Sequence, residues 1–392
     1  MQVGRYLAEL KRKHQVILVT TPEERGWIVN DPSLDAGWDD MERLVLRLPL
    51  HRLSGRLLAS RYARRWARPD TFFWITGMAS SIIRHLSRQP DIIYSRSLPF
   101  SSALLARALK QRLRVPWIMH LSDPWLDNPY LAFRSERENE QEYSCFLAAD
   151  GISVTTECLM DFYREKYPEF GEKLFVSPNV MPVKGQGGGE RKAKVTSRNL
   201  KLLYTGALYG NRDPRLLLDA LDELARDDSR FHQAVELQFV GNVSEGIARM
   251  IGDAGLPGVS LLGRRDYDDV LKLQAGADVM LSFEPDGENP LLKCFLPSKV
   301  LDYIHAGKPF VAITPEGSET WRLCEQGYGW AISPDDKAGL KDLLLRLLGQ
   351  KQAGGQVVPG APKELPPQYF ARSCVERLEG KMTRLCGESS RK

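Results

Sequence analysis

Short apolar runs alternate with longer stretches of helical periodicity along most of the chain. The runs are four or five residues long and rich in Val, Ile and Leu, which is typical of strands buried in a parallel sheet. Strands that alternate with helices indicate βαβ units, so the pattern predicts an α/β fold. The predicted strands are residues 16–20, 44–48, 92–96, 117–121, 152–155, 202–205, 237–240, 259–262, 279–283 and 310–313.

The two series of predicted strands are separated by residues 184–199, which contain four glycines and no apolar periodicity. This composition indicates a linker or a surface loop. Because 392 residues exceed what one hydrophobic core usually holds, we predict two Rossmann-like domains, residues 1–183 and 200–349. Residues 350–392 are predicted to form a tail rich in Gly and Pro, followed by a terminal helix whose apolar face needs a surface to cover.

The amino-terminal end departs from the order of a doubly wound sheet. Residues 3–10 carry a helical pattern and the strand 16–20 follows, whereas such a sheet is normally opened by a strand and a glycine-rich turn. We therefore expect the first strand of the N-terminal domain to be missing and its usual neighbours to be left unpaired. Two explanations stay open: a start further upstream, or a copy that has lost the strand.

Basic residues are concentrated in one part of the chain. Residues 43–114 carry fifteen Lys and Arg against two acids, a net charge of +13, whereas the whole chain carries +4. Within them, Leu58, Tyr62 and Trp66 recur every four residues beside arginines. This pattern predicts a patch that binds an anionic membrane surface, and the alternative is a solvated basic helix with a core-facing stripe. No nucleic-acid recognition motif accompanies the charge, so no nucleic-acid partner is predicted.

The sequence contains no segment typical of a membrane span, a secretion signal or a metal site. The longest uncharged segment considered, residues 71–83, has thirteen residues, fewer than the roughly 20 that a spanning helix needs. The first 24 residues lack the continuous apolar stretch of a secretory signal. The six cysteines show no Cys-x-x-Cys spacing, so no metal is predicted. We therefore expect a cytoplasmic protein that binds peripherally at the inner membrane face.

The first candidate site follows the predicted strand 117–121, which ends in a polar segment containing His120 and Asp123. In open α/β sheets, ligands bind outside the carboxyl ends of the strands. His120 and Asp123 are therefore candidate catalytic residues. The alternative is a buried core histidine and an aspartate that caps the turn before Pro124.

The second candidate site is a glycine turn after the predicted strand 202–205, leading into a helix that begins near Asp213 and Pro214. The N–H groups and the dipole of a helix N-terminus favour an anion. Gly206 and Arg212 are therefore candidates for binding a phosphate. The alternative is a plain turn, because glycines are common wherever a strand leads into a helix.

The third candidate site is a predicted helix that begins near Ser298 and ends before Gly307. Lys299 lies in its first turn, where the helix dipole disfavours a cation by about 0.3 to 1 kcal/mol. A bound phosphate would reverse that effect. Asp302 lies on the same face, so the alternative is a surface ion pair with Lys299, which contributes about 0.2 to 0.5 kcal/mol.

At these positions the chain resembles the glycosyltransferases of the GT-B type, family 4. Gly206 and Arg212 take the place of the family's glycine and phosphate-binding lysine. Asp302, five residues before Gly307, takes the place of the glutamate that holds the nucleotide ribose. The segment Asp123-Pro124-Trp125 is similar to a signature of a subgroup that builds bacterial surface polysaccharides.

The resemblance implies two Rossmann-like domains that face a central cleft, with the nucleotide-sugar bound by the C-terminal domain and a terminal helix that crosses back to the first domain. It implies transfer of a sugar, with retention of configuration, to a lipid-linked or polysaccharide acceptor at the cytoplasmic membrane face. Preorganised N–H groups and cations would stabilise the departing diphosphate in place of a metal, and no cofactor is expected.

The chain departs from the family pattern on the donor side. Ala207 stands where the family usually has an arginine, so Arg212 and Lys299 are expected to share the charge of the pyrophosphate. Cys294 stands where the earlier of two acidic residues is expected. The candidate for that role is Glu288, with Glu284 and Asp286 in the same longer loop as alternatives.

Two other functions fit the same residues. One is a nucleotide-sugar epimerase on the same two-domain plan. The other is a catalytically silent subunit that binds a sugar nucleotide, which the missing strand and Ala207 favour. Release of nucleoside diphosphate that requires an acceptor would indicate the transferase. A change in the sugar without an acceptor would indicate the epimerase. Binding without turnover would indicate the silent subunit.

Overall fold

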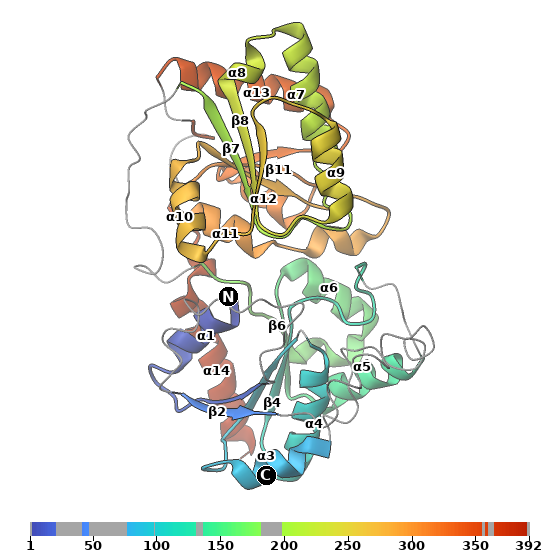
Figure 1. Ribbon diagram of the computed structural model, residues 1–392. Helices are drawn as coiled ribbons and strands as arrows, with labels where there is room; N and C mark the ends of the chain where they lie inside the picture. The colour runs from blue at the N-terminus through green and yellow to red at the C-terminus, as the bar shows by residue number, and fades with distance from the viewer. Residues whose placement is uncertain are drawn as a thin grey trace. The chain divides into compact units, whose positions relative to one another are not determined.

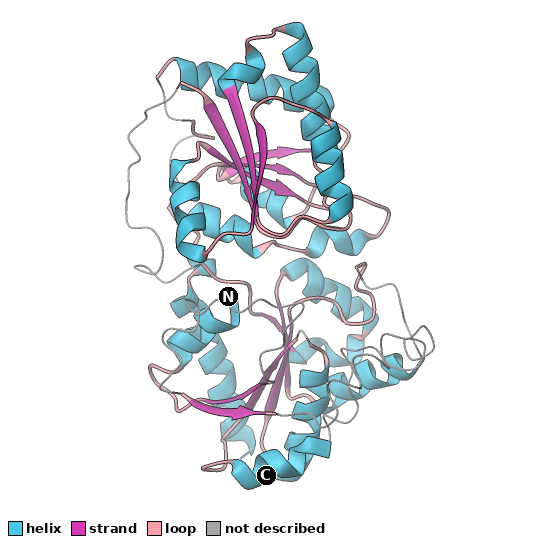
Figure 2. Cartoon of the chain, viewed as in Figure 1, coloured by secondary structure: helices cyan, strands magenta, loops and turns pink. Residues whose placement is uncertain are grey.

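The structure, a computed structural model, describes residues 2–20, 41–46, 77–97, 99–130, 136–181, 198–354, 357–359 and 364–389. The chain divides into two compact units. Unit 1 comprises Met1–Val180 and Gln368–Lys392, and unit 2 comprises Met181–Pro367. Helices and strands alternate in both (Figure 2). Most of the predicted linker 184–199 and the basic membrane patch predicted around residues 58–74 lie outside the described residues.

Unit 1 contains two parallel sheets in its described part. One pairs β1 (Ile17–Thr20) with β2 (Glu42–Val45). The other has the order β3 (Ile93–Arg96), β4 (Trp117–Leu121), β5 (Gly151–Val154) and β6 (Leu174–Val176). The accompanying helices are α1 (Gln2–Leu10), α3 (Ala79–His85), α4 (Ser101–Leu113), α5 (Glu136–Ala148), α6 (Glu157–Lys166), the 3-10 helix η4 (Pro168–Lys173) and α14 (Ala371–Ser389).

The described strands of unit 1 fall into two separate sheets. Within the described residues, β1 pairs with β2 and β3 pairs with β4, and no strand joins β1 to β3. The two sheets nevertheless share a core, because Val19 and Leu44 pack on the same cluster as Ile93. The central strands β4 and β5 are buried along their whole length, as their continuous apolar sequences predict.

The terminal helix α14 belongs to unit 1, where it lies beside α1 (Figure 1). Its buried positions Ala371, Cys374, Val375 and Leu378 recur at the spacing of one helix face. Glu379, the residue after Leu378, accepts hydrogen bonds from Lys13 Nζ and His14 Nε2, both at 2.9 Å. The two ends of the described chain are therefore held together within one unit.

Unit 2 is a single six-stranded parallel sheet in the order β12-β11-β10-β7-β8-β9, with helices on both faces (Figure 1). Its strands are β7 (Leu200–Thr205), β8 (Val235–Val240), β9 (Val259–Gly263), β10 (Val279–Phe283), β11 (Phe310–Ile313) and β12 (Gly329–Ile332). Its helices are α7 (Arg215–Asp227), α8 (Phe231–Ala234), α9 (Glu245–Asp253), α10 (Tyr267–Gly276), α11 (Ser298–His305), α12 (Glu319–Glu325) and α13 (Lys337–Gln352), with the 3-10 helices η5 (Pro290–Cys294) and, at its junction with unit 1, η6 (Pro367–Tyr369). Successive strands extend the sheet to one side of β7, with β8 and β9, and then to its other side, with β10, β11 and β12. The boundary between β7 and β10 is therefore a switch point, where open α/β sheets bind ligands.

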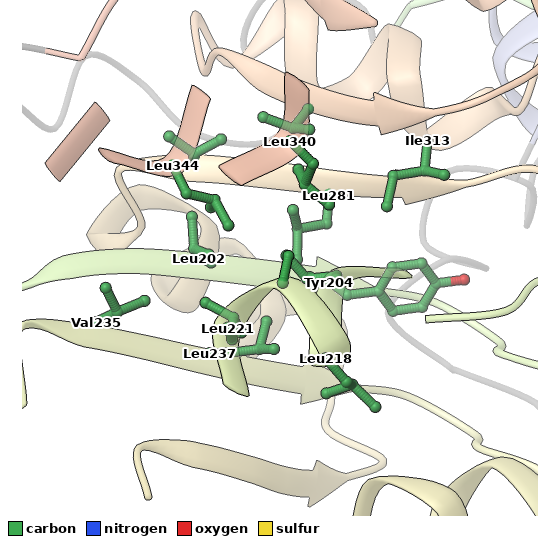
Figure 3. Close-up of a cluster of buried hydrophobic side chains, with 14 of the residues drawn as sticks. Leu202, Tyr204, Leu218, Leu221, Val235, Leu237, Leu281, Ile313, Leu340 and Leu344 are labelled. Carbon is green, nitrogen blue, oxygen red and sulfur yellow. The ribbon is translucent and has the colours of Figure 1, made fainter. Parts of the chain in front are cut away.

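The core of unit 2 fills the space between its sheet and two helices. Figure 3 shows Leu202, Leu237 and Leu281 of the sheet packed with Leu218 and Leu221 of α7 and Leu340 and Leu344 of α13. Tyr204 belongs to the same cluster, and its hydroxyl group points out of it (Figure 3). The core therefore fixes the base of a side chain whose tip lies near the carboxyl end of β7.

Each of the ten predicted apolar runs overlaps a strand, with ends that differ by up to three residues. The pattern missed β6 and β12, which have three and four residues and form edges of their sheets. An edge strand needs less apolar sequence than a central one, because part of it faces solvent.

Two glycines hold the ends of β7 and β8 unusually close. A Cβ atom at Gly241 would lie 2.1 Å from the carbonyl oxygen of Gly206, and Gly241 has φ +130°. Gly206 has φ +114° and donates its N–H to the carbonyl of Val240 at 2.9 Å. Both positions therefore require glycine.

We expect Gly241→Ala to lower the free energy of unfolding by about 2 to 4 kcal/mol, because it adds both backbone strain and overpacking. The matched control is Gly246→Ala in α9, where an added Cβ would contact nothing within 4 Å. That control should raise stability by about 0.5 to 1 kcal/mol. Urea unfolding of both variants measures the difference, and equal effects would show that the close approach is not constrained.

Candidate functional site

A group of polar side chains in unit 2 surrounds the carboxyl ends of β7 and β10, at the switch point of the sheet. They come from the end of β7, the turn before α7, the residue after β10, and the first turn of α11. The group consists of Tyr204, Arg212, Glu284 and Lys299, and the backbone of Gly206 lies beside them.

Lys299 is the central member of this group. Its Nζ atom lies 3.7 Å from the centroid of the Tyr204 ring, close enough for a cation–π contact. The Nζ atom is buried and makes no hydrogen bond to any residue that the structure describes. It forms no ion pair with Asp302, so the surface pair considered from the sequence is not formed. Within the described residues, the ammonium group therefore has one aromatic neighbour and no hydrogen-bonded carboxylate.

Burial holds the pKa of Lys299 well below its usual value, and the positive charge of Arg212 lowers it further, whereas Glu284 opposes the shift. A buried ammonium group without a hydrogen-bond acceptor is unfavourable for stability. The position also lies in the first turn of α11, where the helix dipole is positive. A bound anion would accept a hydrogen bond from the ammonium group, offset the positive charge of Arg212 and interact favourably with the helix dipole.

Arg212 and Tyr204 converge on the carbonyl oxygen of Ala207. Arg212 Nη1 donates to that oxygen at 3.3 Å, and the Tyr204 hydroxyl donates to it at 2.8 Å. The Arg212 guanidinium also lies 4.9 Å from the centroid of the Tyr209 ring. Because both contacts use neutral groups, the positive charge of Arg212 is oriented without being neutralised.

Gly206 contributes space to the site. Its own amide is engaged by Val240, which corrects the expectation that this amide is available to a phosphate. A Cβ atom added to Gly206 would lie 3.6 Å from Lys299 Nζ. The glycine therefore keeps the backbone bare beside the ammonium group, where a ligand can approach it.

Glu284 is a buried carboxyl group, 7% exposed, at the end of β10. Thr314 Oγ1 donates to Oε2 at 2.8 Å, and Ser282 Oγ donates to Oε1 at 3.3 Å. Thr314 in turn contacts Ser318 Oγ at 2.8 Å. Burial raises the pKa of Glu284 above its usual value, although these hydrogen bonds and Lys299 oppose the shift. Of the three acidic residues considered from the sequence, this is the one coupled to Lys299.

The other two predicted donor residues are placed differently. Asp302 lies on α11, one turn after Lys299, as the spacing predicted. Glu288 is exposed in the segment between β10 and η5, and no contact within the described chain joins it to Lys299. Its assignment to the donor sugar stays a prediction.

Lys308 of the Gly-Lys-Pro turn has a structural role. Its Nζ donates to the carbonyl oxygens of Ala275 and Ala277 at 2.6 and 2.7 Å. These carbonyls end α10, so Lys308 caps that helix. The turn that carries the family resemblance is therefore part of the scaffold.

In unit 1, the structure places His120 and Asp123 at the carboxyl end of β4. His120 is 1% exposed, and its Nδ1 lies 3.0 Å from Ser153 Oγ. Burial, followed by the charge of Arg96, holds the pKa of His120 well below its usual value, so the ring is neutral at pH 7. Asp123 lies in the turn that follows and is partly exposed.

The turn after Asp123 is anchored by its buried neighbours. The Trp125 N–H donates to the Tyr163 hydroxyl at 3.0 Å, and the Leu126 N–H donates to Glu142 Oε2 at 2.8 Å. The Trp125 ring stacks on Phe100 with a centroid distance of 4.9 Å. The Asp-Pro-Trp segment therefore uses its tryptophan to hold the turn in place.

The geometry of unit 2 suits an anionic ligand with several oxygen atoms. Lys299, Arg212 and the N-terminus of α11 supply positive charge, and no side chain caps that N-terminus. Among the residues that the structure describes, no group of three His, Cys, Asp or Glu side chains is arranged to hold a metal ion.

Tyr204, Gly241, Thr314 and Ser318 were not identified from the sequence. Three of them stand at or directly after the carboxyl end of a strand, which is the signal that could have singled them out. Their roles depend on which strands are neighbours, and that order is not readable from one sequence.

Two domain families match the chain. Residues 1–179 match the glycosyl transferase 4-like domain, and residues 199–350 match the glycosyl transferases group 1. Together they span both units. Neither match distinguishes a polysaccharide subgroup. No curated protein has significant sequence similarity to the chain.

Several solved structures share the fold of the whole chain. HepE of Anabaena, in complex with UDP, has a TM-score of 0.64 at 14% identity, covering 98% of this chain and 96% of its own. The E. coli trehalose-6-phosphate structure, bound with UDP-2-fluoro glucose, has a TM-score of 0.65 at 13% identity, covering 97% and 95%. The UDP-GlcNAc 2-epimerase of Neisseria meningitidis has a TM-score of 0.57 at 12% identity, covering 98% and 96%. These likenesses establish a GT-B fold, and the fold alone does not separate a transferase from an epimerase.

No helix in the described part of the chain has the length and apolar character needed to cross a membrane.

The unpaired ammonium of Lys299 predicts an unusual stability effect. We expect Lys299→Met to raise the free energy of unfolding by about 1 to 3 kcal/mol, because it removes a buried unsatisfied donor while a sulfur–aromatic contact replaces the cation–π contact. The matched control Lys308→Met should lower stability by about 1.5 to 3 kcal/mol, because it removes charge-assisted hydrogen bonds. Urea unfolding tests both, and a loss of stability in Lys299→Met would mean that its ammonium group is satisfied in the folded protein.

Proposed function

Because the chain belongs to the GT-B glycosyltransferases of family 4, we propose that it binds a nucleotide-sugar through Lys299 and Arg212 of unit 2 and transfers the sugar to an acceptor. The observation that carries this proposal is the buried Lys299 ammonium, which lies at the switch point of the sheet and has no hydrogen-bond acceptor in the described part of the chain. A diphosphate provides the acceptor atoms that the ammonium lacks.

The chemistry explains why cations are needed at this position. When the bond between the anomeric carbon and the diphosphate oxygen breaks, the electron pair stays on the oxygen, and negative charge develops there. Lys299 and Arg212 would stabilise this charge, and one such contact in a preorganised site contributes about 2.7 to 4 kcal/mol to lowering a barrier. The proposal requires no metal ion, and the family resemblance implies that configuration at the anomeric carbon is retained.

Asp302 and the acidic residues after β10 would hold the rest of the donor. We assign the ribose to Asp302, because it lies one turn beyond Lys299 on α11. For the donor sugar, the exposed Glu288 is the sequence candidate, and the buried Glu284 is favoured by its electrostatic coupling to Lys299. His120 and Asp123 of unit 1 are proposed to act on the sugar and the acceptor.

We propose a lipid-linked or saccharide acceptor at the cytoplasmic face of a membrane. Two sequence features support it: the net charge of +13 over residues 43–114, and the similarity of Asp123-Pro124-Trp125 to a polysaccharide-building subgroup. Anionic lipids would attract such a segment, which would bring the protein to a lipid-linked acceptor.

The proposed function predicts that nucleoside diphosphate is released from a UDP-sugar only when an acceptor is present. The assay uses a panel of UDP-sugars with vesicles that contain a polyprenyl diphosphate-linked sugar, and it measures UDP release with and without EDTA. We expect release to depend on the vesicles and to be unaffected by EDTA. Release of an epimerised sugar without vesicles, or complete loss of turnover in EDTA, would refute the proposal.

Removing the charge of Arg212 should abolish donor binding and leave the fold intact. We expect Arg212→Ala to weaken UDP binding beyond detection in calorimetry, because one of the two cations is lost and Ala207 supplies none in its place. The matched control is Arg215→Ala, since Arg215 is exposed and already paired with Asp213 at 2.6 Å. That control should keep the affinity within about twofold. Unchanged affinity in Arg212→Ala would remove Arg212 from the site.

A further inference from the structure

Two polar side chains in unit 1, Arg96 and His120, also have unsatisfied nitrogen atoms within the described residues. Arg96 and His120 are the carboxyl-terminal and penultimate residues of β3 and β4 and are register partners in the parallel ladder. Side chains at partner positions of a sheet lie on the same face. Arg96 Nε and His120 Nε2 are both buried, and neither has a hydrogen-bond partner among the residues that the structure describes.

Two aromatic residues orient the Arg96 side chain. Its guanidinium carbon lies 4.6 Å from the centroid of the Tyr6 ring, and Nη1 donates to the Tyr94 hydroxyl over a long 3.4 Å. Tyr6 itself is fixed, because its hydroxyl contacts Ser177 Oγ at 3.0 Å and donates to the Pro178 carbonyl at 2.7 Å. Arg96 makes no ion pair with a carboxylate of the described chain. Its charge is thus held in place by neutral groups.

His120 is oriented by Ser153. Ser153 Oγ lies 3.0 Å from His120 Nδ1 and 3.5 Å from the Met119 carbonyl. The shorter contact favours a Ser153 hydroxyl that donates to Nδ1, which places the ring proton on Nε2. The unsatisfied Nε2 is then an N–H donor on the same face of the sheet as the Arg96 side chain, and the charge of Arg96 acts on the ring.

We propose that Arg96 and His120 bind an oxyanion, a phosphate or carboxylate group carried by the acceptor. The pair supplies a fork-shaped cation and a neighbouring N–H donor, the combination that recognises oxygen atoms of an anion. Leaving both groups unsatisfied in the interior is unfavourable, and one anion would satisfy both. The assignment of the anion to the acceptor rests on the proposed function, whereas the anion site itself does not.

The site predicts that inorganic phosphate perturbs His120 directly. In the full-length protein at constant ionic strength, phosphate titration should shift the His120 side-chain NMR resonances saturably, with the signals identified by their loss in His120→Gln. Arg96→Gln should weaken this binding at least tenfold, and Arg96→Lys, which keeps the charge without the fork, should give an intermediate affinity. The matched control Arg164→Gln removes an exposed arginine paired with Asp161 and should change nothing.

A parallel titration with acetate distinguishes a carboxylate from a phosphate group. Saturable shifts with acetate at equal or lower concentration assign a carboxylate, and shifts with phosphate alone assign a phosphate. If neither anion moves the His120 resonances, or if Arg96→Gln binds phosphate as tightly as the unmodified protein, the proposal is wrong.

Two further measurements separate this site from the donor site. Lys299→Met should leave the phosphate-induced shift of His120 unchanged, because Lys299 belongs to unit 2. UDP calorimetry on the Arg96 variants should give the affinity of the unmodified protein. If the unmodified protein does not bind UDP but shows the phosphate-induced His120 shift, the donor assignment is wrong and the oxyanion site stands.

Discussion

The donor side of this protein depends on one constraint: within the described residues, the buried Lys299 ammonium has no hydrogen-bond acceptor. Positive charge at this position is unfavourable in isolation, because the group is buried against an aromatic ring with a second cation nearby and no carboxylate of the described chain hydrogen-bonded to it. Folding tolerates it because the surrounding core is large and because the Tyr204 ring offers partial compensation. Such a site can bind a diphosphate more tightly than a lysine already held in an ion pair could, because no existing contact has to be broken first.

The backbone around Lys299 is arranged for the same purpose. Gly206 and Gly241 bring the ends of β7 and β8 together, and Gly206 leaves bare backbone beside the ammonium group. The Ala207 carbonyl oxygen accepts hydrogen bonds from Arg212 and from the Tyr204 hydroxyl. This one oxygen therefore orients both the Arg212 guanidinium and the Tyr204 ring that contacts Lys299. The small residues at these positions are thus as important to the site as the charged ones.

Both units place their unsatisfied groups at the carboxyl ends of parallel strands. In unit 2 the cation is Lys299, and in unit 1 it is Arg96, and each is oriented by tyrosine rather than by an acid. The shared principle is that an aromatic face can hold a cation without neutralising it. For a glycosyltransferase, this gives one unit a means to bind the leaving diphosphate and the other a means to bind a charged acceptor.

The sequence by itself determined the approximate positions of the central strands, the α/β class and the helix that carries Lys299 and Asp302, because these depend on local periodicity and spacing. It also singled out Arg212 and His120, which stand beside strand ends that are visible as apolar runs. Only the tertiary structure decided that Lys299 is unpaired, that the Gly206 amide is already used, that Glu284 is the acid coupled to the cation, and that Arg96 lies beside His120. Each of these facts depends on which strands are neighbours and which atoms are shielded from water, and such relations join residues too far apart in the chain for a local pattern to record.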